Sequence, residues 1–344
     1  MLTLKLEKPR DWRLTESEEP KGPGPGEALV RVWRAGICGT DISGYLGKMP
    51  FFSYPRIPGH ELGVEVLSLG EGVNHLKPGD TCSVEPYINC GSCFSCHRDR
   101  GNCCENLQVL GVHVDGGLRP RFIVPARKLH PASGLTLEQL ALVETLAIGC
   151  HAVDRAAIAP DEFALVVGAG PIGLSVAEFV RLAGCRFAIL DVNAKRLGFC
   201  KEKMGIATTI LAHGGPEDIA AIRDAGGGNL PTVVIDATGH PRAMERSLEF
   251  LSFTGRMVYV GIVPDPIAVP DPLFHRREMT IMGSRNALPG DFRRIIDLIR
   301  KGNIDTRPWI SHTVGFKEVP ERFDQLTRPE TGVIKAIINL DSVN

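Results

Sequence analysis

Two kinds of hydrophobic pattern divide the chain at about residue 150. Before that point, residues 27–33 and 63–70 alternate in part between apolar and polar side chains, and turns rich in Gly and Pro bound both segments. Short alternating segments with such boundaries predict the strands of a β-rich, barrel-like module. The first part of the chain is therefore expected to be a β-rich domain.

After residue 150 the apolar positions form short continuous runs. The runs at 163–167 and 187–190 are separated by a helical stretch, which predicts buried parallel strands joined by a crossover helix. A helical pattern covers residues 242–251. Further candidate strands lie at 208–211, 232–238, 256–261 and 280–284. This alternation predicts an open α/β sheet.

Length and charge limit the classes of function. The 344 residues fit about two domains. With 39 basic and 40 acidic residues the net charge is -1, so the chain as a whole does not attract nucleic acid or an anionic membrane. The sequence contains neither an apolar run of about 18 residues nor the apolar stretch of a signal peptide. We expect a cytoplasmic protein with no nucleic-acid and no membrane partner.

The 10 cysteines change this picture because five of them lie within residues 90–104. In a reduced chain such clustering indicates a metal or catalytic site rather than a disulfide scaffold. Four thiolates from one loop suit tetrahedral zinc with no open position, which is a structural site. An iron–sulfur cluster also uses four cysteines, and Cys103 could compete with its neighbour as a ligand. The four predicted ligands are Cys90, Cys93, Cys96 and Cys104.

A glycine-rich turn supplies the second chemical signal. The pattern GxGxxG at 168–173 directly follows the apolar run 163–167 and opens a helix. Its glycines allow a tight turn and let the backbone approach a pyrophosphate at the helix N-terminus. Asp191, which ends the next strand, can accept hydrogen bonds from the adenosine ribose hydroxyls. A carboxylate there would repel a 2′-phosphate, so the sequence predicts NAD rather than NADP.

A second set of metal-ligand residues is scattered along the chain. Cys38 lies in GICGTD, His60 and Glu61 lie in PGHE, and Glu144 lies in VETLAIGCHA. One thiolate, one imidazole and carboxylates suit a zinc ion that keeps a position open for substrate. Taken singly, each residue also has a structural explanation, and the spacing does not bring them together.

Along the chain the motifs follow in the order GICGTD, PGHE, the cysteine loop, GxGxxG with Asp191, and DATG at 236–239. With this order and these separations, nearly the whole chain resembles the zinc-dependent medium-chain dehydrogenase/reductase family. Glu144 stands where alcohol dehydrogenases of the family have a second cysteine, which resembles the sorbitol and polyol dehydrogenase branch. Residues 50–61 and 283–287 further resemble bacterial sugar-acid dehydrogenases. The resemblance implies an α/β protein with a GroES-like β-rich catalytic domain and a Rossmann domain with a doubly wound parallel sheet. These domains would span residues 1–150 with 287–344, including a zinc lobe at about 88–106, and residues 151–286.

The resemblance also implies cofactors and roles for single residues. It places a catalytic zinc on Cys38 and His60, with Glu61 and Glu144 as ligands directly or through water, and a second, structural zinc on the four cysteines of the lobe. Thr40 would hydrogen-bond the substrate oxygen and relay its proton. NAD would contact Gly168, Gly170, Pro171, Ile172, Gly173, Asp191, Arg196, Thr238, Val260 and Gly261.

Two departures from the family concern the substrate side. Ser43 stands where many members have a histidine at the outer end of the proton relay, and a hydroxyl cannot hold a proton near neutral pH. Arg119 and Arg121 stand where an acidic or aromatic pair is commoner, and they fit a subunit contact, a solvated edge or an electropositive approach for an anionic substrate. Arg285 resembles an arginine near the substrate, and His113 is a candidate for lining the pocket.

Together these features predict that hydride passes from a secondary alcohol of a polyol or a sugar acid (an aldonate) to NAD. The alternatives are a threonine-type amino-alcohol dehydrogenase, a primary-alcohol dehydrogenase, and a nucleotide-binding protein without catalysis. Two zinc ions per chain would fit an enzyme, and one would favour the non-catalytic alternative. The resemblance implies a homodimer or homotetramer formed through the last strands of the coenzyme sheet.

Overall fold

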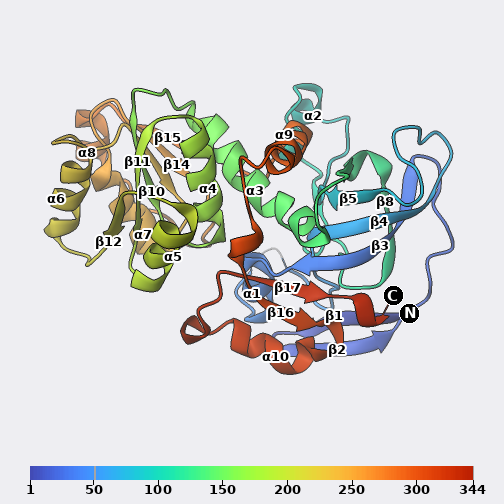
Figure 1. Ribbon diagram of the computed structural model, residues 1–344. Coiled ribbons are helices and arrows are strands. Elements are labelled where there is room, and N and C mark those ends of the chain that lie inside the picture. Colours follow the sequence, from blue (N-terminus) through green and yellow to red (C-terminus); the bar gives the residue numbers. More distant parts are fainter. Residues whose placement is uncertain (50–51, 344) are drawn as a thin grey trace. The chain divides into compact units, whose positions relative to one another are not determined.

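The computed structural model describes residues 1–49 and 52–343 and divides into two compact units (Figure 1). The first unit comprises Met1–Thr145 and Leu288–Asn344, and the second comprises Leu146–Ala287. The sequence predicted these divisions at residues 150 and 287. Part of the predicted sugar-acid motif, residues 50 and 51, lies outside the described residues.

A mixed sheet forms the centre of the first unit. Its strand order is β16-β17-β3-β4-β5-β9, with β8 paired to β3, while β1 pairs with β2 and β6 with β7. Alternate residues of β3, among them Ala28, Val30 and Val32, are fully buried, which is the one-sided pattern that the sequence predicted. The strands are β1 (Leu2–Lys8), β2 (Asp11–Glu16), β3 (Glu27–Gly36), β4 (Glu61–Leu69), β5 (Thr81–Val84), β6 (Tyr87–Ile88), β7 (Gln108–Val109), β8 (Arg121–Pro125), β9 (Leu129–Pro131), β16 (Ile310–Gly315) and β17 (Lys335–Asn339).

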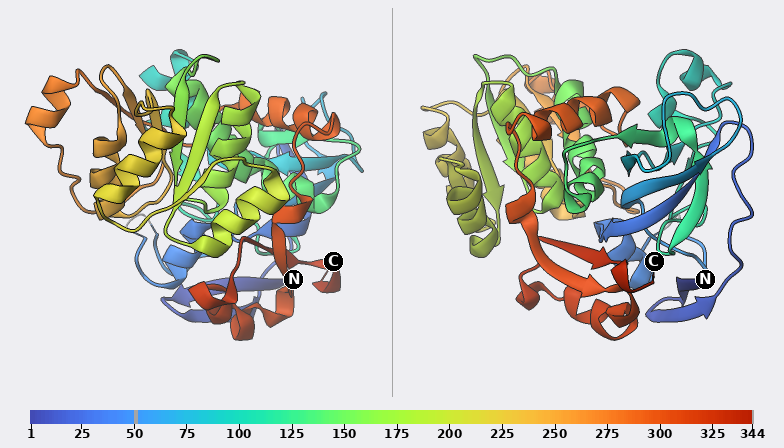
Figure 2. Two further views of the ribbon diagram at one scale, coloured as in Figure 1. Left: turned by 60° about the vertical axis from the view of Figure 1, so that its left-hand side comes forward. Right: turned by 45° about the vertical axis from the view of Figure 1, so that its right-hand side comes forward.

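The carboxyl-terminal strands complete this sheet. Strand β17 pairs antiparallel with β3, so that Ile337 lies opposite Gly36, and Figure 2 shows the red strands beside the blue ones. The helices of the unit are α1 (Gly39–Tyr45), α2 (Phe94–His97), α9 (Pro289–Arg300) and α10 (Val319–Leu326). Helix α3 (Leu137–Ala156), which the sequence analysis did not predict, contains the division between the two units.

The second unit contains a wholly parallel sheet. Its order is β12-β11-β10-β13-β14-β15, which reads 3-2-1-4-5-6 along the chain and is the order of doubly wound dinucleotide-binding domains. All five residues of β10 are buried, as expected for a strand covered on both faces. The strands are β10 (Phe163–Val167), β11 (Arg186–Asp191), β12 (Thr209–Leu211), β13 (Val233–Asp236), β14 (Arg256–Tyr259) and β15 (Thr280–Gly283).

Helices connect these parallel strands (Figure 1). They are α4 (Pro171–Leu182), α5 (Ala194–Met204), α6 (Pro216–Ala225), α7 (Pro241–Ser247) and α8 (Asp271–Arg276). The helix expected at 242–251 leaves the α-helical conformation at Ser247 and continues as a 3-10 helix over Leu248–Phe250. Other 3-10 helices lie at Gly101–Cys103, Ala126–Lys128, Arg307–Trp309, Phe316–Glu318, Pro329–Thr331 and Asp341–Val343.

The predicted fold class agrees with this architecture, a β-rich domain together with a doubly wound parallel sheet. In the described part of the chain, none of the helices has both the length and the apolar character needed to cross a bilayer.

Candidate metal centres and coenzyme site

Antiparallel pairing of β3 and β4 brings the scattered ligand residues together. Gly36 at the end of β3 lies opposite Glu61 at the start of β4, so Cys38 and His60 leave the sheet side by side. The ligand atoms of Cys38, His60 and Glu61 all lie within 4.8 Å of one another. A Cβ atom on Gly36 would lie only 2.0 Å from Glu61 Oε2, so the absence of a side chain at this position makes room for the carboxylate.

The Glu61 carboxylate is fully buried and is held through one of its oxygens. Lys335 Nζ, from the first residue of β17, and Thr145 Oγ1, at 2.8 Å, both donate to Glu61 Oε1. Burial of Lys335 opposes its charge, but the nearby Glu61 and Cys38 raise the pKa of the ammonium group. The other oxygen, Glu61 Oε2, has no hydrogen-bond partner among the described residues. One carboxylate oxygen therefore remains available to a ligand.

His60 is paired with a second buried carboxylate, Asp41. The Cys38 amide donates to Asp41 Oδ2 at 2.9 Å, which leaves Asp41 Oδ1 3.8 Å from His60 Nδ1. Although burial opposes the charged imidazole, Asp41 and Cys38 raise the pKa of His60 well above its usual value. Neither Asp41 Oδ1 nor His60 Nδ1 has a hydrogen-bond partner in the described part of the chain. A carboxylate beside one ring nitrogen is the arrangement that orients a metal-binding imidazole.

Glu144 lies on helix α3, outside the group defined by the 4.8 Å limit. Its carboxylate accepts a hydrogen bond from the Tyr87 hydroxyl, and both side chains are buried. Burial raises the pKa of Glu144, while electrostatic attraction to His60 and Lys335 acts in the opposite direction. Glu144 therefore belongs to the same electrostatic cluster, and its direct ligation of zinc stays a prediction.

The half-buried thiol of Cys38, together with a buried imidazole and a buried carboxylate that have unpaired polar atoms, forms a donor set that fits zinc. Thr40 and Ser43 lie on helix α1, which begins directly after Cys38. Residues three apart occupy the same face of a helix, so the two hydroxyls lie one above the other, and both residues are half-buried.

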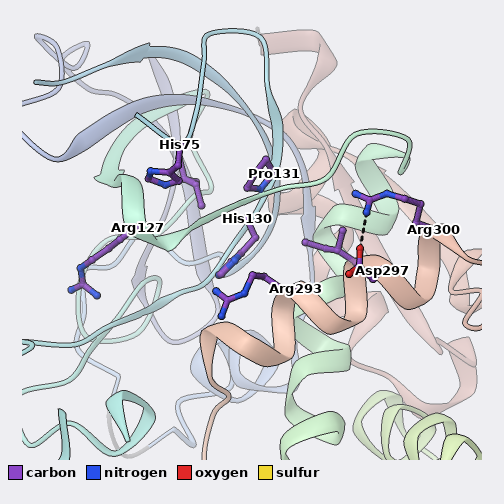
Figure 3. A pocket seen from close by; sticks show the side chains of 9 residues that line it. His75, Arg127, His130, Pro131, Arg293, Asp297 and Arg300 are labelled. Atoms are coloured by element: carbon purple, nitrogen blue, oxygen red, sulfur yellow. Dashed lines mark hydrogen bonds and ion pairs between the residues drawn. The ribbon is translucent and has the colours of Figure 1, made fainter. Parts of the chain in front are cut away.

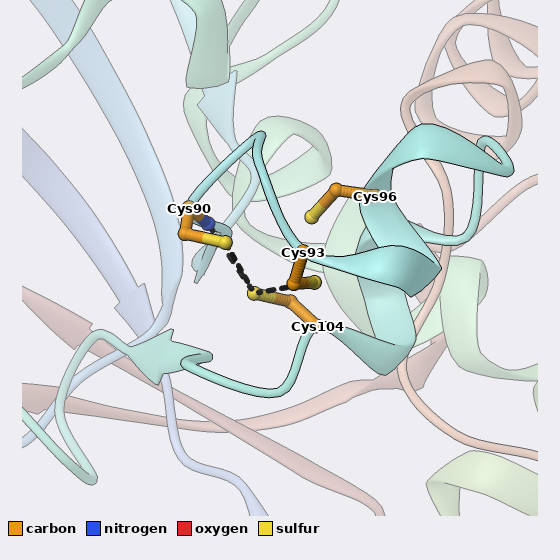
Figure 4. Close-up of side chains that lie close together, drawn as sticks. All are labelled: Cys90, Cys93, Cys96 and Cys104. Atoms are coloured by element: carbon orange, nitrogen blue, oxygen red, sulfur yellow. Dashed lines mark hydrogen bonds between the residues drawn. The ribbon is translucent and has the colours of Figure 1, made fainter.

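The four cysteines of the lobe form the second cluster (Figure 4). Their sulfur atoms all lie within 4.8 Å of one another, with Cys104 Sγ 3.5 Å from Cys90 Sγ and 3.9 Å from Cys93 Sγ. Sulfur atoms in a tetrahedral zinc site lie about 3.8 Å apart, given zinc–sulfur bonds of about 2.3 Å. Cys103 is exposed and is not part of the group. The residues that the sequence analysis selected therefore fit a structural zinc.

Hydrogen bonds to the cysteine sulfurs of this lobe stabilise their thiolate forms. The Ser92 amide and hydroxyl donate to Cys90 Sγ at 3.5 and 3.6 Å, and they lower the pKa of Cys90 to about 5. The Cys90 amide donates to Cys104 Sγ at 3.3 Å, and Asn89 Nδ2 donates to Cys96 Sγ at 3.4 Å. Because the thiolate is the form that binds metal, these donors favour zinc binding.

The glycine-rich turn has the expected geometry at the end of β10. Gly168 has φ +99°, a backbone conformation that favours glycine, and a Cβ on Gly173 would lie 1.8 Å from the Gly168 carbonyl oxygen. Pro171 and Ile172 begin helix α4, and the first N–H groups of a helix have no partner within it, so they can bind an anion. The turn lies between β10 and β13, where the strand order reverses and dinucleotides bind in this fold.

Asp191 ends β11, as predicted, and its carboxylate is already oriented. Oδ2 accepts from the Ala169 amide at 2.6 Å and Oδ1 from the Asn193 amide at 2.7 Å. Each oxygen keeps a lone pair for a ribose hydroxyl. The Arg196 guanidinium lies beside the turn, 3.8 Å from where a Cβ on Gly170 would be.

The remaining predicted coenzyme residues lie at the ends of the next strands. Thr238 follows β13, and both its amide and its hydroxyl donate to Asp236 Oδ1, at 2.9 and 2.7 Å. Val260 and Gly261 follow β14, and a Cβ on Gly261 would lie 2.5 Å from the Gly239 amide nitrogen. These positions share one edge of the sheet with the glycine-rich turn.

The residues predicted for the substrate side have different surroundings. The Arg119 guanidinium donates to the backbone carbonyls of Gly116 and Asp115, and His113 Nδ1 accepts from the Val109 amide at 3.1 Å. Arg121 forms an ion pair with Glu19. Arg285 is exposed and follows β15 in the second unit. The substrate roles of His113, Arg119 and Arg285 stay predictions.

Sequence reasoning did not single out Asp41, Tyr87, Thr145 or Lys335. A signal existed for Lys335, because a lysine within the otherwise apolar run 333–338 must be paired if the strand is buried. Asp41 was visible only as part of GICGTD. Nothing in the sequence connects Tyr87 with Glu144, which lies 57 positions away.

A doubly wound coenzyme sheet and two separate zinc-compatible clusters define the class of dinucleotide-dependent zinc dehydrogenases. Residues 24–134 match the model of the alcohol dehydrogenase GroES-like domain, and residues 171–301 match that of the zinc-binding dehydrogenase. The chain belongs to this zinc-binding alcohol dehydrogenase family and is an oxidoreductase. The predictions of the family, the enzyme class and zinc as a cofactor are confirmed.

Individual relatives match over almost their full length. The chain is 38% identical to L-galactonate-5-dehydrogenase of Escherichia coli K12, covering 98% of both chains. It is 31% identical to 2-dehydro-3-deoxy-L-galactonate 5-dehydrogenase of Pseudoalteromonas atlantica, covering 93% of both. Among solved structures, the alcohol dehydrogenase rspB of E. coli CFT073 in complex with NADH is 29% identical, with a TM-score of 0.91 and 99% of both chains covered.

Proposed function

We propose that this protein oxidises a secondary hydroxyl group of a sugar acid and transfers the hydride to NAD. The observation that carries the proposal is the cluster of the half-buried Cys38 with the buried His60 and Glu61, in which an imidazole nitrogen and a carboxylate oxygen lack partners among the described residues. Zinc bound there would supply a Lewis acid that lowers the pKa of the substrate hydroxyl.

The residues of the chain would then bind the substrate and carry its proton away. Thr40 accepts the proton from the substrate hydroxyl and passes it to Ser43 on the same face of α1. A serine hydroxyl cannot store the proton, so water must take it from Ser43. The carbon loses a hydride to the nicotinamide, the hydroxyl loses a proton, and the products are a ketone, NADH and H⁺. Lys335 and Thr145 hold Glu61 in place throughout.

NAD as the coenzyme is supported by Asp191, because its preoriented carboxylate suits ribose hydroxyls and repels a 2′-phosphate. The NADH complex of the rspB relative agrees with this preference. A sugar acid as the substrate is supported by the two galactonate-type relatives. The arginine that we assign to the substrate carboxylate is Arg285, because a guanidinium can bind both oxygens of a carboxylate.

The test is an oxidation screen of aldonates, the matching polyols and amino alcohols with NAD and with NADP, with zinc measured on the same sample. We expect the highest kcat/KM for an aldonate with NAD and about two zinc ions per chain. Arg285→Leu should lower kcat/KM for the aldonate roughly tenfold or more and leave the polyol unchanged. Arg276→Leu, at another exposed arginine of the second unit, is the control. An aldonate preference that survives Arg285→Leu would exclude the carboxylate role.

The assembly and location that we propose are a homodimer or homotetramer in the cytoplasm. The support for assembly is that β15 ends the parallel sheet and none of its four residues is buried, so its outer edge can pair with another chain. Light scattering of the purified protein measures the mass directly. A mass of one chain would exclude this assembly.

A further inference from the structure

A cavity of about 320 Å³ lies in the first unit. It shares no residue with the cysteine lobe, with the cluster around Cys38 or with the glycine-rich turn. Helix α9 forms one wall, and strand β9 with the preceding segment forms another (Figure 3). Its apolar surface comes from Leu129, Pro131 and Ile296. The family matches and the proposed oxidation assign no role to this cavity.

The charged side chains around this cavity are mostly cationic. Arg127, Arg293 and Arg300 line it, against one acidic residue, Asp297, which accepts from Arg300 at 2.7 Å. The lining therefore carries an excess of two positive charges. Arg127 and Arg300 each donate a side-chain hydrogen bond. Within residues 1–49 and 52–343, Arg293 forms neither such a hydrogen bond nor an ion pair. Cationic groups gathered around a concave, partly apolar surface attract anions.

Hydrogen bonds hold two of the three arginines, Arg127 and Arg300. Positions 293, 297 and 300 share one face of α9, and the opposite face is buried through Phe292, Ile295 and Ile299. On the other wall, Arg127 donates to the side chain and the carbonyl of Asn89, at 2.6 and 2.7 Å. Cations that are already held, here Arg127 and Arg300, lose less entropy when a ligand binds.

The base of the cavity is also rigid. His130 is buried, its Nε2 lies 3.1 Å from Glu85 Oε2, and its ring stacks on Phe292 with centroids 4.9 Å apart. The ammonium group of Lys128 neutralises Glu85. The negative charge of Glu85 therefore does not cancel the field of the arginines.

We propose that this cavity binds a small phosphomonoester, with the phosphate on Arg293 and Arg300 and the organic part over Leu129, Pro131 and Ile296. A phosphate ester carries a charge of about −1.5 to −2 on one group, which matches the two excess positive charges of the side chains that line the cavity. The guanidinium fork matches phosphate oxygens in two-point contacts. The volume exceeds what a phosphate group alone fills, and the apolar surface accommodates the rest of the ester.

The experiment measures binding by calorimetry, with ribose 5-phosphate as the probe and the zinc-loaded enzyme saturated with NAD, so that the coenzyme occupies its own phosphate-binding turn. We expect saturable binding of one ribose 5-phosphate per chain. Arg293→Ala and Arg300→Ala should each weaken it roughly ten- to hundredfold. The matched control is Arg294→Ala, an exposed arginine of the same helix that does not line the cavity. Its affinity should equal that of the unaltered protein.

Three further ligands test which part of ribose 5-phosphate the cavity recognises. Ribose lacks the phosphate, inorganic phosphate lacks the sugar, and succinate carries two charges on carboxylates. Each should bind at least roughly tenfold more weakly than ribose 5-phosphate.

Absence of ribose 5-phosphate binding, or binding that Arg293→Ala and Arg300→Ala leave unchanged, would overturn the site. Equal binding of succinate or of inorganic phosphate would overturn its assignment to phosphate esters. The readout is affinity rather than turnover, so it is independent of the proposed oxidation.

Discussion

The two metal-compatible clusters of the first unit are built in opposite ways. The cysteine lobe takes all its ligands from residues 90–104, and Cys90 is exposed. The other cluster joins Cys38 to His60 and Glu61 across β3 and β4, and its partners come from α3 and β17. The first site is local in the sequence, and the second exists only after the sheet has formed.

The two clusters are stabilised by different interactions. In the lobe, backbone and side-chain N–H groups donate to the sulfurs, and a metal would provide most of the remaining cohesion. In the other cluster, a buried carboxylate is compensated by a buried lysine, Lys335. A structural site can therefore be open to water, whereas the imidazole and the carboxylates of the candidate catalytic site are buried, which strengthens the charge interactions among them.

The largest effect is expected in the lobe. Cys104→Ser removes one of four zinc ligands, and structural zinc contributes about 10 kcal/mol or more in isolated zinc-binding peptides. We expect the zinc content to fall by one ion per chain and the thermal midpoint to drop sharply, as measured by metal analysis and calorimetry. Cys103→Ser, at the exposed neighbour, should change neither. Equal effects of both substitutions would contradict the assignment of the fourth ligand.

The next largest effect is expected on turnover. Cys38→Ala or His60→Ala removes a Lewis-acid contribution of several kcal/mol, so kcat should fall by about a thousandfold or more. Binding of NAD, measured by fluorescence titration, should stay nearly unchanged. Cys82→Ala, at a buried cysteine of the same unit, serves as the control and should keep its activity. Near-normal turnover in the His60 variant would show that the two clusters do not differ as proposed.

Lys335→Met tests whether the second cluster depends on charge compensation. Leaving the Glu61 carboxylate buried without its partner should cost about 3–5 kcal/mol in the free energy of unfolding, measured with denaturant. The double variant Lys335→Met with Glu61→Gln should recover part of that loss.

The same pair predicts a pH dependence. Glu61 and Cys38 raise the pKa of Lys335 despite its burial. The stabilisation that the charged lysine gives to the folded state is therefore complete below about pH 10.4, which is the pKa of a lysine in the unfolded chain. It is lost as the pH rises further, through the folded pKa. The unaltered protein should therefore lose stability above about pH 10.4 more steeply than Lys335→Met. Parallel curves would contradict this.

The smallest effect is expected at Tyr87. Tyr87→Phe removes the hydroxyl that donates to the buried Glu144, and the loss of a hydrogen bond to a charged group costs about 1.5–3 kcal/mol. If the hydroxyl also orients Glu144, kcat should fall while the KM for NAD stays constant. A variant that loses stability but keeps its kcat would limit Tyr87 to a structural role.

Prediction from the sequence was most accurate where the signal is local. The runs that became β10 and β11, the turn at 168–173 and the four lobe cysteines needed only neighbouring residues. Helix α3 was missed because its residues are apolar around most of its surface, so no helical periodicity stands out. The helix expected at 242–251 was too long, because the periodicity does not report the change to a 3-10 helix at Leu248.

The glycine-rich turn, the position of Asp191 at the end of the next strand and the clustering of the four cysteines could be predicted from the sequence, because they depend on residues close together in the chain. The residues that surround Cys38 come together only when the sheet forms. Pairing of β3 with both β4 and β17 brings Glu61 and Lys335 together from 274 positions apart. The structure also placed Glu144 on Tyr87, outside the tight ligand group. Burial makes these partners necessary, since a carboxylate removed from water requires a donor or a cation that no local pattern reveals.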